Sequence, residues 1–373
     1  MKIDKILFLL FFLMFIKSGF ADEILPYTDS KILYEGRVDI TEGDGLGLYW
    51  PGTSVKAKFT GTEIWAEMQD FSSENVNYYY VLIDGQIKQK IKIEGQTKQY
   101  YLLASGLDNQ EHTVEMVKLN HMHEGYKRSY SKFHNLKIVG TGAFLPISKT
   151  KTLKMEFYGN SITAGLSSEW SVPNADNTGG EYENNYITYA ARTARYFNAQ
   201  YSCIAKSGIG LMASTTLTNM PLMYDKINPL ETNRLWDFNR YQPNIVVVNL
   251  LQNDASIINN PSGYQTSYNW AFPNGAPTDE DIVNAYKTFI TGLRSKYPNA
   301  NIICTLGNMS AVAVSQNGRW KNYITAAINQ LNDNKVYVNF FAYRGMSGHP
   351  KANDNEQMAQ NLICFIKCKN LFN

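Results

Sequence analysis

The sequence has few or none of the features that mark several large classes of protein. Four cysteines in 373 residues are too few for a scaffold held together by disulfides. There is no P-loop, no dinucleotide-binding glycine fingerprint, and no His/Cys set at zinc-site spacing. Low-complexity tracts and internal repeats are also missing. The composition, with 44% hydrophobic and 18% charged residues, is instead typical of a folded globular protein.

The four cysteines fall into two groups. Cys203 and Cys304 lie within predicted core strands, where buried thiols are ordinary. Cys364 and Cys368 are one helical turn apart, and a bridge between them would strain the helix. The spacing leaves open whether any of the four is paired.

The only long apolar run lies at the N-terminus. Residues 6–16 follow Lys2 and Lys5 and precede small residues, which predicts a signal peptide over residues 1–21. The run is too short for a comfortable membrane span, so we expect a secreted or periplasmic protein, with a retained anchor as the alternative. Cleavage removes three lysines and one aspartate and takes the net charge from +2 to zero. No nucleic acid partner and no stable membrane anchor are therefore expected.

Length and patterning predict two domains. Between residues 28 and 145 the hydrophobic period is two, as where Val55, Ala57 and Phe59 alternate with polar residues. Asp84-Gly85 separates two such runs and is a strong signal for a tight hairpin. Many short strands with regular turns predict an all-β sandwich of the jelly-roll type.

A join over residues 143–150 leads into a region of different pattern, residues 150–373. Residues 244–251 form a continuous apolar run of the kind that parallel sheets bury on both faces. Thr278 and Asp281 form a capping-box-like start to the clearest helix of the chain. Strands that alternate with helices predict a three-layer, doubly wound α/β domain.

One hydroxyl stands at a predicted strand end in this second domain. The apolar run that starts at residue 153 ends in Gly-Asn-Ser, which places Ser161 at the carboxyl edge of the sheet, where ligands bind. A nucleophilic serine needs a base. His349 is the only one of five histidines in this domain, and it follows the last strand at the same edge. The pattern therefore favours Ser161 and His349 as a catalytic pair, although a lone loop histidine is more often a surface residue.

Two further strand ends offer donors for an oxyanion. Residues 206–210 contain Gly208 and Gly210, whose backbone N–H groups can approach a ligand closely. Asn253 follows the apolar run at 244–251 and carries a side-chain NH₂ group. Ordinary turn chemistry is the alternative reading of both segments.

Together these segments resemble a known superfamily. Gly-Asn-Ser-Ile-Thr, the glycine block, Gln-Asn-Asp and Gly-His-Pro are similar to the four blocks of the SGNH (GDSL-like) hydrolases. The preceding sandwich, with Gly36-Arg37, Trp50 and the segment 59–62, resembles that of family 2 carbohydrate esterases. The resemblance implies a flavodoxin-like SGNH hydrolase domain that follows a jelly-roll domain. It also implies a reaction that needs no metal or cofactor. It also implies Ser161 as nucleophile, His349 as base, and oxyanion donors from Ser161, Gly208 and Asn253, with Gly210 as the alternative to Gly208.

The sequence departs from the superfamily pattern in two places. Asn160 stands where an aspartate is usual, and Met346 occupies the position of the acid three residues before the histidine. Some members of the family that this sequence resembles use a Ser–His dyad without an acid. We therefore expect a dyad here, with a backbone carbonyl orienting the imidazole of His349.

The resemblance predicts a secreted carbohydrate esterase that removes O-acetyl groups from polysaccharides or oligosaccharides. The alternatives are an esterase acting on other acyl esters, such as cell-wall glycan or small esters, and a non-catalytic glycan-binding protein with a decayed site. Aromatic faces stack on sugars, but most tryptophans are core residues. The candidates in the second domain are Trp170, Trp236, Trp270 and Trp320.

Overall fold

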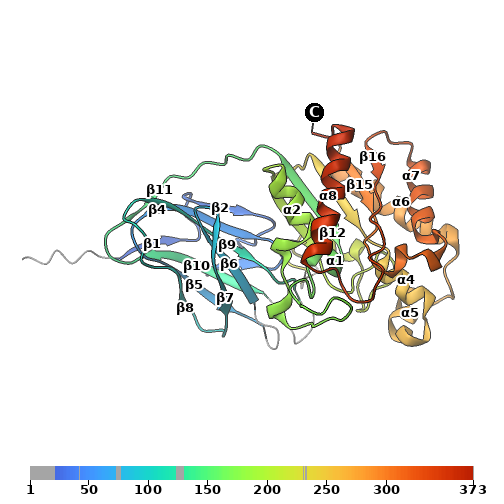
Figure 1. Ribbon diagram of the computed structural model, residues 1–373, viewed down its shortest axis with the longest axis horizontal. Coiled ribbons are helices and arrows are strands. Elements are labelled where there is room, and N and C mark those ends of the chain that lie inside the picture. Colours follow the sequence, from blue (N-terminus) through green and yellow to red (C-terminus); the bar gives the residue numbers. More distant parts are fainter. Residues whose placement is uncertain are drawn as a thin grey trace, which may run out of the picture.

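The computed structural model describes residues 22–372, apart from 42, 73–76, 123–129, 230 and 232. The predicted signal peptide lies outside the described residues. A β-sandwich and an α/β domain lie next to each other along the long axis of the molecule (Figure 1). Within the described ranges, no helix has the length and apolar character needed to cross a bilayer.

The N-terminal part consists of two antiparallel sheets, which confirms the predicted sandwich. One sheet has the order β1 (Glu23–Pro26), β10 (Ser131–Ile138), β5 (Ile64–Asp70) and β8 (Gln99–Ala104), and β3 (Leu46–Leu48) also pairs with β10. The other has the order β11 (Ala143–Leu145), β4 (Ser54–Thr60), β9 (Glu111–Lys118), β6 (Asn77–Ile83) and β7 (Gln86–Ile93), and β2 (Ile32–Glu35) also pairs with β4. Strand β1 precedes residue 28, so the first sheet begins ahead of the expected range 28–145.

The period of two in the sequence corresponds to a core between these sheets. Val55, Ala57 and Phe59 of β4 are buried there, while the residues between them are only half-buried. The predicted hairpin joins β6 to β7, and Asp84 and Gly85 both have positive φ, 52° and 78°. A two-residue turn in which both residues have positive φ fits the right-handed twist of the strands that it connects.

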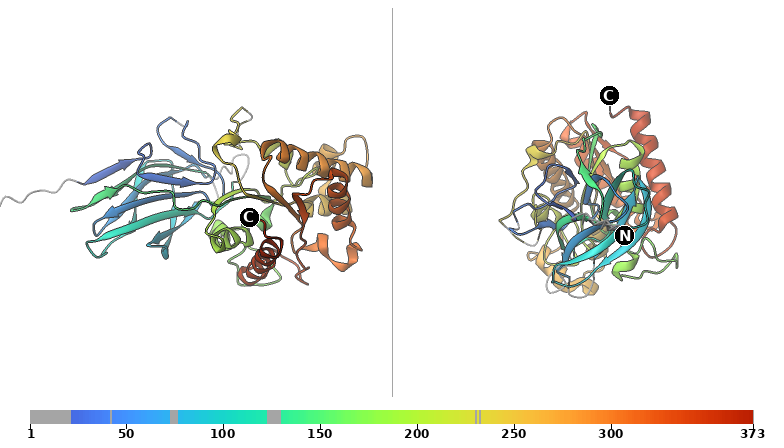
Figure 2. Two further views of the ribbon diagram at one scale, coloured as in Figure 1. Left: turned by 90° about the horizontal axis from the view of Figure 1, so that it is seen from above. Right: turned by 90° about the vertical axis from the view of Figure 1, so that its left-hand side faces the viewer.

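The second part is a parallel five-stranded sheet covered on both faces, which confirms the predicted three-layer α/β domain. Its strand order is β13 (Gln200–Ala205), β12 (Lys154–Gly159), β14 (Ile245–Asn249), β15 (Asn301–Thr305) and β16 (Val336–Val338). Helices α2 (Tyr189–Tyr196) and α8 (Ala352–Lys369) pack on one face, and α6 (Asp279–Lys296) and α7 (Arg319–Leu331) on the other (Figure 2). Numbered along the chain this order is 2-1-3-4-5, the flavodoxin-like order.

Shorter helices occupy the connections of this domain. They are α1 (Ser161–Ala164), α3 (Met220–Met223), α4 (Gln252–Asn259) and α5 (Gln265–Ala271), with 3₁₀ turns η2 (Gly180–Tyr182), η3 (Asn185–Ile187), η4 (Phe238–Arg240), η5 (Ser262–Tyr264), η6 (Ser310–Val312) and η7 (Val314–Gln316). The predicted capping box at the start of α6 is present, since Thr278 and Asp281 cap each other's backbone N–H groups. The apolar run at 244–251 leaves the sheet after Asn249, and Leu251, with φ of 77°, turns the chain into α4. This turn brings residues 252–254 to the carboxyl edge of the sheet.

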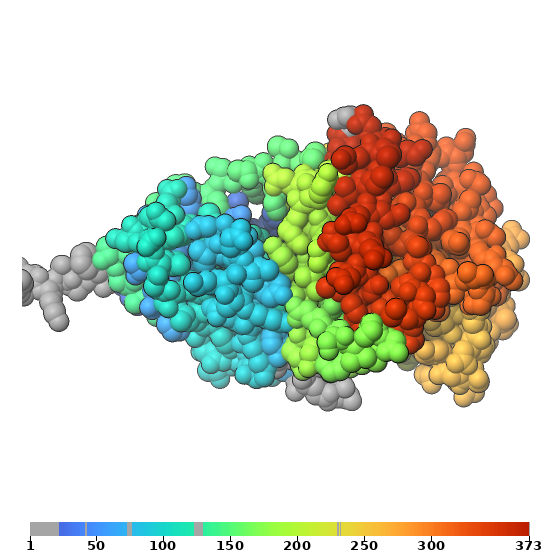
Figure 3. Space-filling view, viewed as in Figure 1, coloured from blue at the N-terminus to red at the C-terminus, as the bar shows by residue number. Residues whose placement is uncertain are grey.

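The two domains lie against each other (Figure 3). Arg37 leaves the sandwich after β2 and is fully buried against the α/β domain, where its Nη2 lies 3.2 Å from Glu156 Oε1 and 2.9 Å from the Tyr158 hydroxyl. Its Nη1 donates to the carbonyl of Tyr224 at 2.6 Å. Trp50 of the sandwich packs within the main hydrophobic core of the α/β domain. The sandwich is therefore part of the framework of the second domain.

Replacement of Arg37 by methionine is expected to lower the free energy of unfolding by about 3–5 kcal/mol, because it leaves the charge of Glu156 buried without its cation. The shift of the urea unfolding midpoint measures the effect. Lys58→Met, which removes a partly exposed partner of Glu111, is the control and should cost less than about 1 kcal/mol. An Arg37→Met midpoint within error of the parent would contradict this assignment.

Candidate active site

Ser161 is the first residue of α1, directly after β12. The side chain of Asn160 caps this helix by accepting the N–H of Ile162 at 3.0 Å. A Cβ at Gly159 would lie 2.1 Å from Thr163 Oγ1, so only glycine fits at the end of the strand. The oxygen of Asn160 provides the cap that an aspartate would give, while its buried Nδ2 has no partner among the described residues. The departure at Asn160 therefore leaves the turn that presents Ser161 intact.

The structure brings Ser161 and His349 together. His349 Nε2 lies 2.7 Å from Ser161 Oγ, although the two residues are 188 positions apart in the sequence. Ser161 is 5% exposed, and His349 lies in the segment that leads from β16 to α8. A nucleophile in hydrogen-bond contact with a base is the arrangement that acyl transfer requires.

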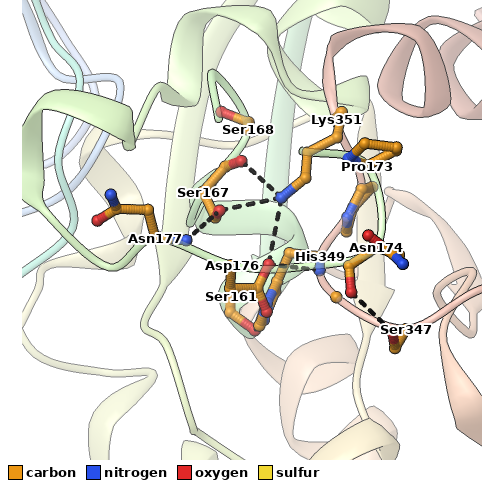
Figure 4. Close-up of polar contacts among 12 residues, drawn as sticks. Ser161, Ser167, Ser168, Pro173, Asn174, Asp176, Asn177, Ser347, His349 and Lys351 are labelled. Carbon is orange, nitrogen blue, oxygen red and sulfur yellow. Dashed lines mark hydrogen bonds and ion pairs between the residues drawn. The ribbon is translucent and has the colours of Figure 1, made fainter. Parts of the chain in front are cut away.

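The expectation that a backbone carbonyl orients His349 is wrong. His349 Nδ1 lies 2.7 Å from Asp176 Oδ2, and Asp176 belongs to the connection between α1 and η2, 173 positions away from His349 (Figure 4). Met346, at the usual position of the acid, is 40% exposed and takes no part in this arrangement. The site therefore contains a Ser–His–Asp constellation whose acid comes from a different segment.

The surroundings of Asp176 keep it ionised. Partial burial alone would raise the pKa of this carboxyl group, but hydrogen bonds and charge from His349, together with Lys351, hold the pKa of Asp176 well below its usual range. An ionised carboxylate can only accept a hydrogen bond, so Nδ1 of His349 carries the proton. In the neutral form of the imidazole, a proton on Nδ1 leaves Nε2 as the acceptor for the proton of Ser161.

Ser161 and His349 lie on one cavity of about 520 Å³ together with Gly208 and Asn253. Its volume is within the range of sites for small organic ligands. His121 and Met122 of the sandwich contribute to its wall, so both domains shape it. The remaining lining residues are Leu166, Thr178, Lys206, Ser207, Thr215, Thr216, Gln252, Ser256, Tyr264 and Met309.

A buried carboxylate holds the chain just after the glycine segment 206–210. Asp254 accepts the backbone N–H groups of Leu211, Met212 and Ala213 at 2.6–2.9 Å. Gly208 has φ of +75°, and a Cβ there would lie 1.9 Å from Thr215 Oγ1. The segment thus depends on a glycine at position 208.

The two glycines of this segment differ in what their N–H groups do. The N–H of Gly210 donates to Ser214 Oγ at 2.8 Å, and Gly210 does not line the cavity. Gly208 lines the cavity, and within the described part of the chain its N–H has no acceptor. Asn253 Nδ2 donates to the carbonyl of Ile209 at 2.8 Å, which leaves the second hydrogen of that amide group available.

Comparison with known proteins places these observations in a family. Residues 34–147 match the family model described as carbohydrate esterase 2 N-terminal. A structure of a family two carbohydrate esterase from Clostridium thermocellum in complex with cellohexaose has a TM-score of 0.77 and 28% identity, and the match covers 92% of this chain and 100% of that one. The chain belongs to carbohydrate esterase family 2.

Curated relatives of this family 2 member have names that include esterase activity. The cellulase/esterase CelE of Acetivibrio thermocellus is 31% identical over 365 residues, which cover 93% of this chain and 41% of CelE. The chain therefore spans about two-fifths of the length of that relative. An acetylxylan esterase / glucomannan deacetylase of Cellvibrio japonicus is 26% identical over 333 residues, which cover 88% of this chain and 84% of that protein.

None of the four candidate tryptophans lines the cavity of this family 2 member. Trp320 is fully buried and Trp236 is 7% exposed, with its ring 5.2 Å from the guanidinium of Arg37. Trp170 packs edge-on against Tyr182, and Trp270 lies half-buried in α5. Among the described residues, Tyr264 is the tyrosine that lines the cavity, and no sequence pattern singled it out.

Proposed function

We propose that this family 2 member is a secreted carbohydrate esterase that removes O-acetyl groups from polysaccharides or oligosaccharides. The observation that carries the proposal is the 2.7 Å contact between Ser161 Oγ and His349 Nε2 on the wall of a ligand-sized cavity. The proposal of secretion depends on residues 1–21, which have the pattern of a signal peptide. The names of the relatives support an acetylated polysaccharide as the substrate.

In the proposed mechanism, Ser161 Oγ attacks the acetyl carbonyl while His349 Nε2 takes the hydroxyl proton. Asp176 accepts a hydrogen bond from the Nδ1–H of His349 throughout, without taking its proton, and stabilises the imidazolium that forms. The N–H groups of Ser161 and Gly208 and the side-chain amide of Asn253 stabilise the tetrahedral oxyanion.

The remaining steps transfer the acetyl group to water. His349 gives its proton to the departing sugar oxygen as the bond between that oxygen and the acetyl carbon breaks. Water then attacks the acetyl-serine, His349 takes a proton from this water, and acetate leaves as the proton returns to Ser161. All of the proton transfers pass through one imidazole, which is why its orientation by Asp176 matters.

Acetate release from a panel of acetylated glycans tests the proposed function. We expect acetate from acetylated glucomannan and acetylated xylan, none from O-acetylated peptidoglycan, and none from any substrate with Ser161→Ala. Preference for peptidoglycan would support an esterase acting on cell-wall glycan instead. Glucomannan binding without acetate release would support a non-catalytic glycan-binding protein.

Replacement of Asn253 by alanine is expected to lower kcat by about 10²–10³-fold, because one donor to the oxyanion is lost, with a small change in KM. Initial rates on an aryl acetate measure the effect. Asn259→Ala is the matched control, since Asn259 lies on the same helix, is exposed, and its side chain donates to Gln316 Oε1 at 3.1 Å. Equal rates for the two variants would remove Asn253 from the oxyanion site.

A further inference from the structure

The segment that carries Asp176 is fastened to the segment that carries His349. Ser347 Oγ donates to the carbonyl of Asn174 at 2.7 Å, and Arg344 Nη2 donates to that of Pro173 at 2.8 Å. Gly348 has φ of +79°, and a Cβ there would lie 3.2 Å from the backbone of this segment. Residues 173–176 therefore lie against residues 344–349 in close backbone contact.

Lys351 is the cation in this contact region that reaches Asp176. Its Nζ lies 3.2 Å from Asp176 Oδ1, and 3.0 Å from both the carbonyl oxygen and Oγ of Ser167 (Figure 4). Its side chain is 12% exposed, and its three acceptors match the three N–H groups of an ammonium. Ser167 Oγ also accepts the N–H of Asn177 at 3.0 Å. Lys351, two residues after the general base His349, thus contacts both ends of the segment between α1 and η2.

The two oxygens of Asp176 have separate tasks. Oδ2 faces His349 Nδ1 at 2.7 Å, whereas Oδ1 accepts the backbone N–H of His349 at 2.8 Å and the ammonium of Lys351. In the superfamily pattern the acid would lie on the same turn as the base, but here the carboxylate belongs to a long irregular connection. Its orientation must therefore come from contacts between segments, and Lys351 supplies the charged one.

We propose that Lys351 is a positioning residue of the esterase reaction: its ammonium fixes Oδ1 of Asp176 so that Oδ2 meets His349 Nδ1. The inference assumes the proposed Ser161–His349 mechanism. Lys351 is not among the residues that line the cavity, and its proposed effect passes through Asp176. A displacement of a catalytic group by about 1 Å can cost on the order of 10²-fold in rate.

A double-mutant cycle on aryl acetate hydrolysis tests the proposal. Lys351→Met should lower kcat by about 10–10²-fold with little change in KM, and Lys351→Arg should recover most of the loss. In an Asp176→Ala background, Lys351→Met should lower kcat by less than about twofold, since the group on which it acts is gone. Lys151→Met, which removes the lysine 2.8 Å from Glu35 outside the cavity, is the control and should leave kcat unchanged.

The outcomes separate this inference from the proposed function. If the Ser161→Ala variant hydrolyses the aryl acetate at the wild-type rate, both the proposed function and the role of Lys351 are overturned. If the rate depends on Ser161 but Lys351→Met leaves it unchanged, only the role of Lys351 is overturned. The same holds if Lys351→Met lowers the rate by the same factor in the parent and in the Asp176→Ala background. Melting temperatures verify folding, and Lys351→Gln replaces the methionine variant if that variant does not fold. We expect a downfield proton resonance of His349 Nδ1 in the parent, and in the folded variant this resonance should broaden or shift.

Discussion

Replacing Ser161 by alanine is expected to lower kcat on an aryl acetate by at least about 10⁴-fold, while the thermal midpoint stays within a few degrees of the parent. The variant loses the atom that attacks the carbonyl, so no acetyl-serine can form. Cavity shape, the donors of Gly208 and Asn253, and the His349–Asp176 hydrogen bond all remain. Residual activity would come from water activated by His349 and from binding alone.

The small change in volume makes this variant a clean test. Only one hydroxyl is removed, and α1 retains its cap from Asn160. Mass spectrometry during turnover should show an added acetyl group on the parent and none on Ser161→Ala. Ser295→Ala, on the exposed face of α6, is the control for serine loss and should retain the parental rate. A Ser161→Ala rate above about one tenth of the parent would mean that another group is the nucleophile.

Local chemistry explains why much of the fold could be predicted from the sequence. The hairpin at Asp84-Gly85 and the start of α6 at Thr278 each depend on a few adjacent residues that favour one backbone geometry. The apolar run at 244–251 has the composition of a strand covered on both faces, and residues 245–249 are fully buried in β14. Such signals are short-range, so reading along the chain suffices to find them.

The same reasoning explains why Ser161 and His349 could be paired before any coordinates. Both follow parallel strands, and the carboxyl ends of parallel strands meet at one edge of a sheet. Two different strand ends can therefore be placed together without knowledge of the loops. The 2.7 Å contact between the two side chains confirms that inference from topology.

Asp176 could not be found in this way. It follows no strand and lies in a connection rich in Gly, Asn and Ser, where an aspartate is ordinary turn chemistry. Its place beside His349 depends on contacts made by Arg344, Ser347 and Lys351, which lie about 170 positions further along the chain. The prediction of a dyad considered only the position of Met346, and contacts between distant irregular segments leave no periodic signal there.

Replacement of Asp176 by asparagine is expected to lower kcat by about 10³–10⁴-fold, with KM changed less than about threefold. The amide has nearly the volume of the carboxylate, so the segment should stay in place. Its charge is lost, however, and an NH₂ group facing His349 Nδ1 would favour the tautomer that carries its proton on Nε2. That tautomer cannot accept the proton of Ser161. The imidazolium formed during attack would also lose its neighbouring negative charge.

The comparison of Asp176→Asn with Asp176→Ala distinguishes a triad from a dyad. If the carboxylate is needed for the tautomer, the asparagine variant should be at least as slow as the alanine variant, which lets water solvate Nδ1. Asp333→Asn, which removes a carboxylate 2.7 Å from Arg294 far from the cavity, controls for loss of an ion pair and should keep the parental kcat. A loss below about tenfold in both Asp176 variants would mean that His349 works as half of a dyad and that Asp176 only fastens the segment. The 2.7 Å contact favours the triad, because it places a carboxylate oxygen of Asp176 directly at Nδ1 of His349.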